Sequence, residues 1–114
     1  MPAAQIMTNA PIEDKKAFLK NMSAAISEVT GKPEAYIMCS VQDNVDMIMS
    51  MATEKPCCFI TFSCIGVISA TKNRSMSEAF SSLMQKTCGV SPERCYINFV
   101  KVERENWGFN GSTF

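Results

Sequence analysis

The pattern of apolar and polar positions in the first third of the chain predicts a strand followed by a helix. Residues 3–8 (AAQIMT) have the character of a short strand. Across residues 13–30 the apolar residues recur every three or four positions, which predicts a helix with one apolar stripe. Gly31 is suited to end this helix, and Pro33 prevents it from continuing. The stripe comprises Phe18, Leu19, Met22, Ala25, Ile26 and Val29.

Strand and helix alternate again in the remainder of the chain. Residues 36–41 are rich in β-forming side chains, and the apolar run 57–65 (CCFITFSCI) predicts a longer strand that ends before Gly66. A second amphipathic helix follows, and Gly89 is suited to stop it. Residues 95–102 then predict a last strand. The stripe of the second helix comprises Met76, Ala79, Phe80, Leu83, Met84 and Cys88.

The start of the second helix is open to two interpretations. Ser75 and Glu78 have the spacing of a capping box, which favours a start at this point. A start one turn earlier is the alternative.

The two halves of the chain repeat each other. GKPEAYIMCSV (31–41) matches GVSPERCYINFV (89–100) when one inserted residue is allowed. We therefore expect one domain over residues 1–114 with an internal repeat, roughly 3–45 and 57–102. Helical crossovers between strands are right-handed and give parallel strand pairs. Two such βαβ units predict an α/β (α+β) fold with a four-stranded mixed sheet and both helices on one face.

This architecture leaves the second face of the sheet without a cover. The runs 57–65 and 95–102 are apolar on both of their faces, with few polar positions. In so short a chain, the cover that we expect is another copy of the same chain. The pattern therefore predicts an oligomer.

Composition and charge exclude several classes of protein. Of the 114 residues, 46% are hydrophobic and 19% are charged, as in ordinary globular domains. Eleven basic residues balance eleven acidic ones, so no surface suited to nucleic acid is expected. No apolar run approaches the roughly 18 residues of a membrane helix. The N-terminus lacks the basic and apolar regions of a secretory signal, and we therefore expect a cytoplasmic protein.

The absence of histidine limits the catalytic and metal-binding sites that the chain can form, and the cysteines are not spaced to form a metal site of their own. With no histidine, pairs of serine or cysteine with histidine are excluded as nucleophiles. The six cysteines show no C-x-x-C spacing, so we expect neither a metal site nor a disulfide framework. Most lie in apolar strand-like runs, where a free thiol behaves as a small buried side chain. No glycine-rich phosphate loop is present, so no nucleotide cofactor is expected.

Several segments resemble the macrophage migration inhibitory factor family, a branch of the tautomerase superfamily. These segments are MP before a first strand, GKPEAYI, SCIGVISATKNRS, SPERCYINF and the tail NWGFNGSTF. They occur in order over nearly the whole chain. The resemblance implies two βαβ units in each subunit and a homotrimer whose sheets surround a central barrel. It also implies active sites between neighbouring subunits that need no cofactor.

The resemblance implies a catalytic role for Pro2. In the family, Met1 is removed and the proline amine moves a proton to and from a carbon next to a carbonyl. A terminal amine has a pKa of about 8 and is mostly protonated at neutral pH. An apolar pocket and a neighbouring lysine both disfavour the charged form. The amine is then near the pH at which a general base is most effective.

The other expected site residues are assigned by resemblance, one position at a time. Lys32 would pair with a substrate carboxylate, although on its own it is a solvated cation at a helix end. Ile65 would line the pocket, and alone it is a core residue. Tyr96 and Asn98 share one face of a strand and would come from the adjacent subunit. Their alternative role is a structural polar pair. The list of expected pocket residues is completed by Trp107 and by Phe114 at the rim.

Some positions depart from the family pattern. Well-known members have valine and tryptophan where this chain has Trp107 and Phe109, so the pocket should stay apolar but change shape. The C-x-x-C of some members is absent, because its second cysteine is replaced by Ile60. Adjacent Cys57 and Cys58 are a poor substitute, and redox activity is not expected from this motif. The methionine-rich segment 46–52 is best interpreted as core or interface filling.

Three functional hypotheses remain at this point. The first is a keto–enol tautomerase (an isomerase) for small aromatic α-keto acids such as phenylpyruvate, or for dopachrome-type compounds. The second is a cytokine-like ligand of a cell-surface receptor, exported by a route without a signal peptide, in which tautomerase activity is vestigial. The third is an inert βαβ scaffold.

Overall fold

Strand and helix alternate twice along the computed structural model, which describes all residues from Met1 to Phe114. The first half contains β1 (Ala3–Thr8), α1 (Lys15–Thr30) and β2 (Met38–Gln42). The second half contains β3 (Cys58–Cys64), α2 (Ala70–Cys88) and β4 (Cys95–Lys101). Three-residue 3-10 turns precede β2 and β4, at Glu34–Tyr36 and Pro92–Arg94. After β4 come a third such turn (Arg104–Asn106) and a small hairpin, β5 (Gly108–Phe109) and β6 (Ser112–Thr113).

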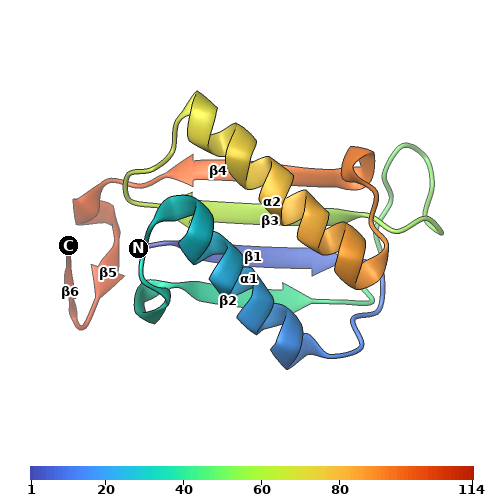
Figure 1. The fold of residues 1–114 in the computed structure, drawn as a ribbon, viewed down its shortest axis with the longest axis horizontal. Helices are drawn as coiled ribbons and strands as arrows, with labels where there is room; N and C mark the ends of the chain where they lie inside the picture. The colour runs from blue at the N-terminus through green and yellow to red at the C-terminus, as the bar shows by residue number, and fades with distance from the viewer.

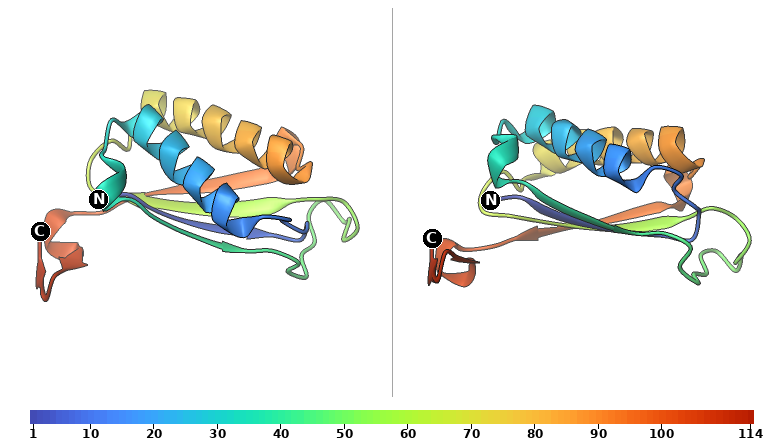
Figure 2. Two further views of the ribbon diagram at one scale, coloured as in Figure 1. Left: turned by 60° about the horizontal axis from the view of Figure 1, so that its bottom comes forward. Right: turned by 90° about the horizontal axis from the view of Figure 1, so that it is seen from below.

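The main sheet has the strand order β2-β1-β3-β4. β1 pairs with β2 in parallel and β3 pairs with β4 in parallel, while the central pair β1 and β3 is antiparallel. Both helices lie on one face, and the other face is bare (Figures 1 and 2). The predicted mixed sheet with two helices on one face is therefore confirmed. Neither α1 nor α2 combines the length and apolar character that a membrane-spanning helix requires.

The hydrophobic core lies between the helices and the sheet. The predicted helix stripes supply it: Phe18, Met22 and Ile26 from α1, and Met76, Phe80 and Met84 from α2. They pack against alternate residues of the central strands, among them Ile6, Ile60 and Phe62. The Phe62 ring lies 5.5 Å from that of Phe80, measured between centroids. Burial of these side chains fixes which face of β1 and β3 is turned toward the helices.

The helix ends are set by capping residues. Asp14 accepts a hydrogen bond from the Ala17 N–H (3.0 Å), so α1 begins at Lys15. Gly31 ends α1 in the left-handed region (φ 74°), as predicted. For α2 the capping-box interpretation is wrong. Ser69 is the N-cap and accepts from the Lys72 N–H (3.2 Å), so the helix starts earlier, at Ala70.

The strands are slightly shorter than the apolar runs that predict them. The strand expected over 36–41 starts only at Met38, because Glu34–Tyr36 forms a 3-10 turn. β3 loses one residue at each end of the run 57–65, and β4 ends at Lys101. Strand ends fray where ladder partners stop, so such differences are expected.

The bare face of the sheet is only partly apolar, which corrects the prediction that its strands are apolar on both sides. Strand register places Gln5, Ser40, Thr61 and Asn98 in one polar row across the sheet. Rows on either side expose large apolar side chains, including Met38 (72% exposed), Tyr96 (66%) and Phe59 (40%). The bare face thus combines a row of polar side chains with exposed apolar side chains, and burial of the apolar ones would be favourable.

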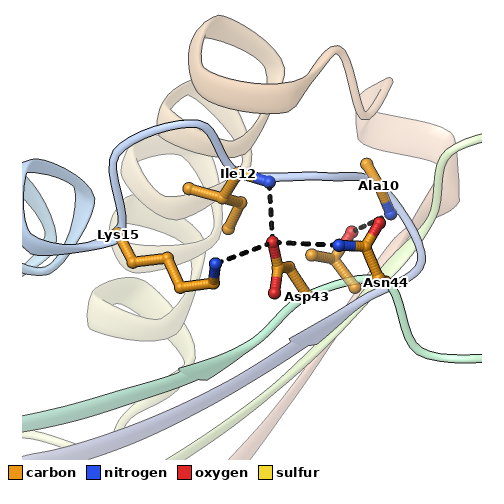
Figure 3. A network of polar contacts seen from close by, with 6 residues as sticks. Ala10, Ile12, Lys15, Asp43 and Asn44 are labelled. Carbon is orange, nitrogen blue, oxygen red and sulfur yellow. Dashed lines mark hydrogen bonds and ion pairs between the residues drawn. The ribbon is translucent and has the colours of Figure 1, made fainter.

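A carboxylate ties the end of β2 to the segment before α1 (Figure 3). Asp43 accepts a hydrogen bond from the Ile12 N–H (3.0 Å) and forms an ion pair with Lys15 (3.3 Å). These contacts hold the pKa of Asp43 below its usual range, chiefly through the Ile12 N–H. Both contacts hold the segment that leads into α1 against the end of β2.

Candidate functional site

Pro2 is held between two strands at one end of the sheet. Its carbonyl accepts a hydrogen bond from the Met38 N–H (3.1 Å) at the start of β2. On the other side, β1 pairs with β3 so that Ala3 is opposite Ser63, which brings Pro2 next to Cys64. The Pro2 side chain is fully buried. The position of its nitrogen is therefore set by the sheet rather than by a free chain end.

An apolar cavity of about 320 Å³ opens beside Pro2. Its lining contains three aromatic side chains and no charged side chain. A cavity of this kind favours an apolar ring and disfavours an uncompensated charge. The lining residues are Met1, Pro2, Ala3, Ala35, Tyr36, Ile37, Met38, Trp107, Gly108 and Phe109.

The C-terminal hairpin supplies the mouth of this cavity. It extends past the end of the sheet where β1 begins (Figure 1). Phe114 does not line the cavity but stacks on Phe109, with ring centroids 5.2 Å apart and planes 12° apart. The Phe114 N–H also donates to the Trp107 carbonyl (3.2 Å). These contacts hold the last residue against the rim.

Trp107 contributes to two neighbouring cavities. Besides the cavity at Pro2, it lines a hollow of about 270 Å³ with Ala4, Ser40 and Val102 among its neighbours. Trp107 therefore borders both cavities.

Lys32 lies near the amino terminus. Its carbonyl accepts from the Ser27 hydroxyl (2.6 Å), and its N–H donates to the Thr30 hydroxyl (3.2 Å), which fixes the backbone after α1. Burial raises the pKa of the Cys64 thiol, while the terminal ammonium and Lys32 oppose this rise. Both cations therefore lie close to Cys64, the neighbour of Pro2. Lys32 can pair with an anionic ligand group at this end of the sheet.

Ile65 follows β3 directly and is partly exposed, but it does not line the cavity in a single chain. Its carbonyl accepts a hydrogen bond from the Cys64 thiol (3.5 Å). Gly66 then turns the chain in the left-handed region (φ 73°). Ile65 therefore lies at the same end of the sheet as Pro2 without touching the cavity.

Tyr96 and Asn98 are not brought to Pro2 within one chain. Both lie on the bare face of β4, opposite Phe59 and Thr61. Phe59 is five residues from Cys64, so Tyr96 is displaced by about 17 Å along the strand direction. The Pro2 side chain is also on the helix face. A site that includes all three residues needs a second copy of the chain.

Two residues near Pro2 escaped the sequence interpretation: Tyr36, which lines the cavity, and Cys64, which neighbours Pro2 without lining the cavity. Tyr36 belongs to a 3-10 turn rather than to the expected strand, which turns its ring toward the cavity. Cys64 was grouped with the core cysteines, because only strand register reveals that it neighbours Pro2. No group of three or more histidine, cysteine or acidic side chains is arranged to hold a metal ion.

Comparison with known proteins assigns the family. The family model described as "Macrophage migration inhibitory factor (MIF)" matches residues 1–114. The chain belongs to the MIF family. A MIF homolog from Brugia malayi is 35% identical over all of this chain and 99% of its own length. MIF of Rattus norvegicus is 34% identical with the same coverage.

Solved structures of MIF homologues share the fold. The homologue from Prochlorococcus marinus superposes with a TM-score of 0.94 at 34% identity, covering 98% of each chain. The MIF-like protein from Entamoeba histolytica has a TM-score of 0.91 at 27% identity, covering 99% of this chain and 98% of that one. The architecture derived from the strand pattern is thus the MIF fold.

Proposed function

We propose that this MIF-family chain is a keto–enol tautomerase that uses the amine of Pro2 as its general base. The observation that carries the proposal is the placement of Pro2, fully buried and fixed by two strands beside an apolar cavity. With Met1 attached, the Pro2 nitrogen is an amide and has no basic lone pair. Removal of Met1 frees the amine and enlarges the cavity at the point where a substrate would react.

The proposed reaction moves one proton and needs no cofactor. The neutral amine takes a proton from the carbon next to the carbonyl of an aromatic α-keto acid, and the resulting ammonium returns that proton to the enolate oxygen, which regenerates the neutral amine. Lys32 pairs with the substrate carboxylate, and its charge disfavours a second cation at Pro2. Tyr36, Trp107 and Phe109 contact the ring. Phenylpyruvate has all of these features, and dopachrome-type compounds share the ring and the carbonyl but are not α-keto acids.

A homotrimer completes the proposed site. Tyr96 and Asn98 of an adjacent copy would steady the carbonyl side and the ring, since the chain's own pair lies too far from Pro2. The exposed apolar side chains of the bare face supply contact area for such an assembly. We expect the three sheets to surround a central barrel, with Ile65 and Phe114 near the boundary between copies.

Replacement of Pro2 tests the proposed base. Wild-type protein and the Pro2→Gly variant, both verified by mass to lack Met1, are compared for conversion of enol-phenylpyruvate to the keto form. We expect kcat/KM to fall at least about 100-fold, the usual contribution of a general base. Circular dichroism and the sedimentation coefficient should not change. Wild-type activity in a variant that has the native assembly would reject Pro2 as the base.

A signalling role is the second proposal, because relatives from Rattus norvegicus and Mus musculus are named for inhibition of macrophage migration. In this proposal the surface of the assembly binds a cell-surface receptor and the tautomerase activity is vestigial. Wild-type and Pro2→Gly proteins would then inhibit macrophage migration equally. Loss of inhibition in the variant would instead link signalling to the pocket, and no inhibition by either protein would refute the role.

A further inference from the structure

Four of the six cysteines gather at the end of the sheet opposite Pro2. Cys57 and Cys58 stand at the start of β3, Cys95 begins β4, and Cys88 is the last residue of α2. All six cysteines of the chain are free. This cluster is separate from the proposed tautomerase site, which lies at the other end of β3.

Strand register pairs two of these thiols directly. Cys58 and Cys95 are opposite each other in the parallel ladder of β3 and β4. Both side chains pack on the helix face, Cys58 within the core and Cys95 at its margin. Neighbouring strands lie about 4.8 Å apart, within the range of Cα separations of about 4.4–6.8 Å found in disulfides.

The backbone around this pair is held by one buried side chain. Arg94, which directly precedes Cys95, donates hydrogen bonds to the carbonyls of Pro56 (2.9 Å), Lys55 (3.2 Å) and Met49 (3.0 Å). The guanidinium thereby ties the chain just before Cys58 to the chain just before Cys95. The two thiols are kept side by side even though 37 positions separate them in the sequence.

The two thiols are unequal in exposure and acidity. Cys58 is 2% exposed, whereas Cys95 is partly exposed. The interaction with Cys95, together with burial, raises the pKa of the Cys58 thiol, and the same interaction lowers the pKa of Cys95. A thiol that is both accessible and more acidic reacts first with an oxidant. Cys88 is engaged elsewhere, since its thiol donates to the Met84 carbonyl (3.3 Å).

We propose that Cys95 and Cys58 form a dithiol that reduces hydroperoxides. The Cys95 thiolate sulfur attacks one oxygen of the peroxide, the O–O bond breaks, and the leaving oxygen takes a proton from water. Cys95 becomes a sulfenic acid. The Cys58 sulfur then attacks the Cys95 sulfur, its proton leaves with the hydroxyl as water, and an S–S bond forms. Two thiols are oxidised to one disulfide while the peroxide is reduced to an alcohol or to water.

Peptide mapping tests the pair in the wild-type protein. Fully reduced protein is treated with hydrogen peroxide, alkylated and digested with trypsin, which releases Cys95 in the short peptide 95–101. We expect two of the six thiols to be lost, a mass decrease of two hydrogens, and a disulfide that joins 95–101 to the peptide 21–72. Trypsin does not cut before Pro33 or Pro56, so that peptide carries four cysteines, and tandem mass spectrometry must assign the bond to Cys58. A Cys95 that stays reduced, a link from Cys95 to another cysteine, or a disulfide between two chains would overturn the proposal.

Neighbouring cysteines provide matched variants. Cys57→Ser should form the disulfide as the wild type does, because Cys58 is retained. In Cys58→Ser, oxidation should stop at the sulfenic acid of Cys95, which dimedone traps as a stable adduct. The opposite result, a disulfide in Cys58→Ser and none in Cys57→Ser, would show that Cys95 pairs with Cys57 and would refute the proposed pair. If Cys58→Ser does not fold, the wild-type map and Cys57→Ser still decide.

Discussion

Pro2 and Cys64 are neighbours across the ladder of β1 and β3, at the end of the sheet that also holds Lys32. Pro2 and Lys32 stand out by resemblance to the MIF family, and both lie at the same end of the sheet. Cys64 and Tyr36 did not stand out, because their importance depends on strand register and on a 3-10 turn. The pattern of apolar residues predicts which side chains are buried. It does not predict which buried side chains lie next to each other on neighbouring strands.

Asp43 gives a prediction about pH at this scale. Its pKa is lowered in the folded protein, chiefly by the Ile12 N–H, so it stabilises the fold fully only above its unfolded pKa of about 3.9. The stabilisation is lost as pH falls through the folded value. Urea unfolding of wild type and Asp43→Asn should therefore differ most at neutral pH and converge below about pH 4. A difference that does not change with pH would contradict this role.

At the scale of elements, the hydrophobic period predicted every major helix and strand, while the ends depended on local contacts. Gly31 ended α1 as expected, since a left-handed residue stops a helix. Of the two starts left open for α2, the capping box at Ser75 is wrong and the earlier start is right, because capping-box spacing also occurs by chance within a helix. Only the observed bond from Lys72 N–H to Ser69 identifies the cap.

Two serine variants test the corrected start of α2. Ser69→Ala removes the acceptor for the Lys72 N–H and should lower the free energy of unfolding by about 1 kcal/mol. Ser75→Ala is the matched control. It lies on an exposed part of the same helix, and its free energy of unfolding should change by less than about 0.5 kcal/mol. Chemical denaturation measures both. A larger loss in Ser75→Ala would restore the rejected cap.

At the scale of the whole molecule, the uncovered sheet face pointed to self-association, but not to its geometry. The sequence overstated how apolar this face is, because Thr61 and Ser63 alternate with the core residues of β3. The polar row through Gln5 and Asn98 became visible only with the register of four strands. The arrangement of copies around a shared site is a property of the assembly. It cannot be predicted from the pattern of apolar and polar residues in one chain.

Mixing two inactive variants tests whether sites are shared between copies. Pro2→Gly and Asn98→Ala are each expected to impair every site of their own trimers. In trimers assembled from equal amounts of both, about a quarter of the sites should combine Pro2 of one chain with Asn98 of its neighbour. Activity toward enol-phenylpyruvate should therefore rise after the two are refolded together. No gain in verified mixed trimers would show that each site belongs to a single chain.

The proposed mechanism requires a free Pro2 amine, left by removal of Met1, that is neutral at physiological pH. Nitrogen-15 NMR of protein labelled at proline measures this directly, because the Pro2 resonance shifts when the amine is protonated. We predict a single titration with a midpoint below physiological pH, and therefore below the ordinary value of about 8 for a terminal amine. A nitrogen that does not titrate, or a midpoint above physiological pH, would refute the proposed base.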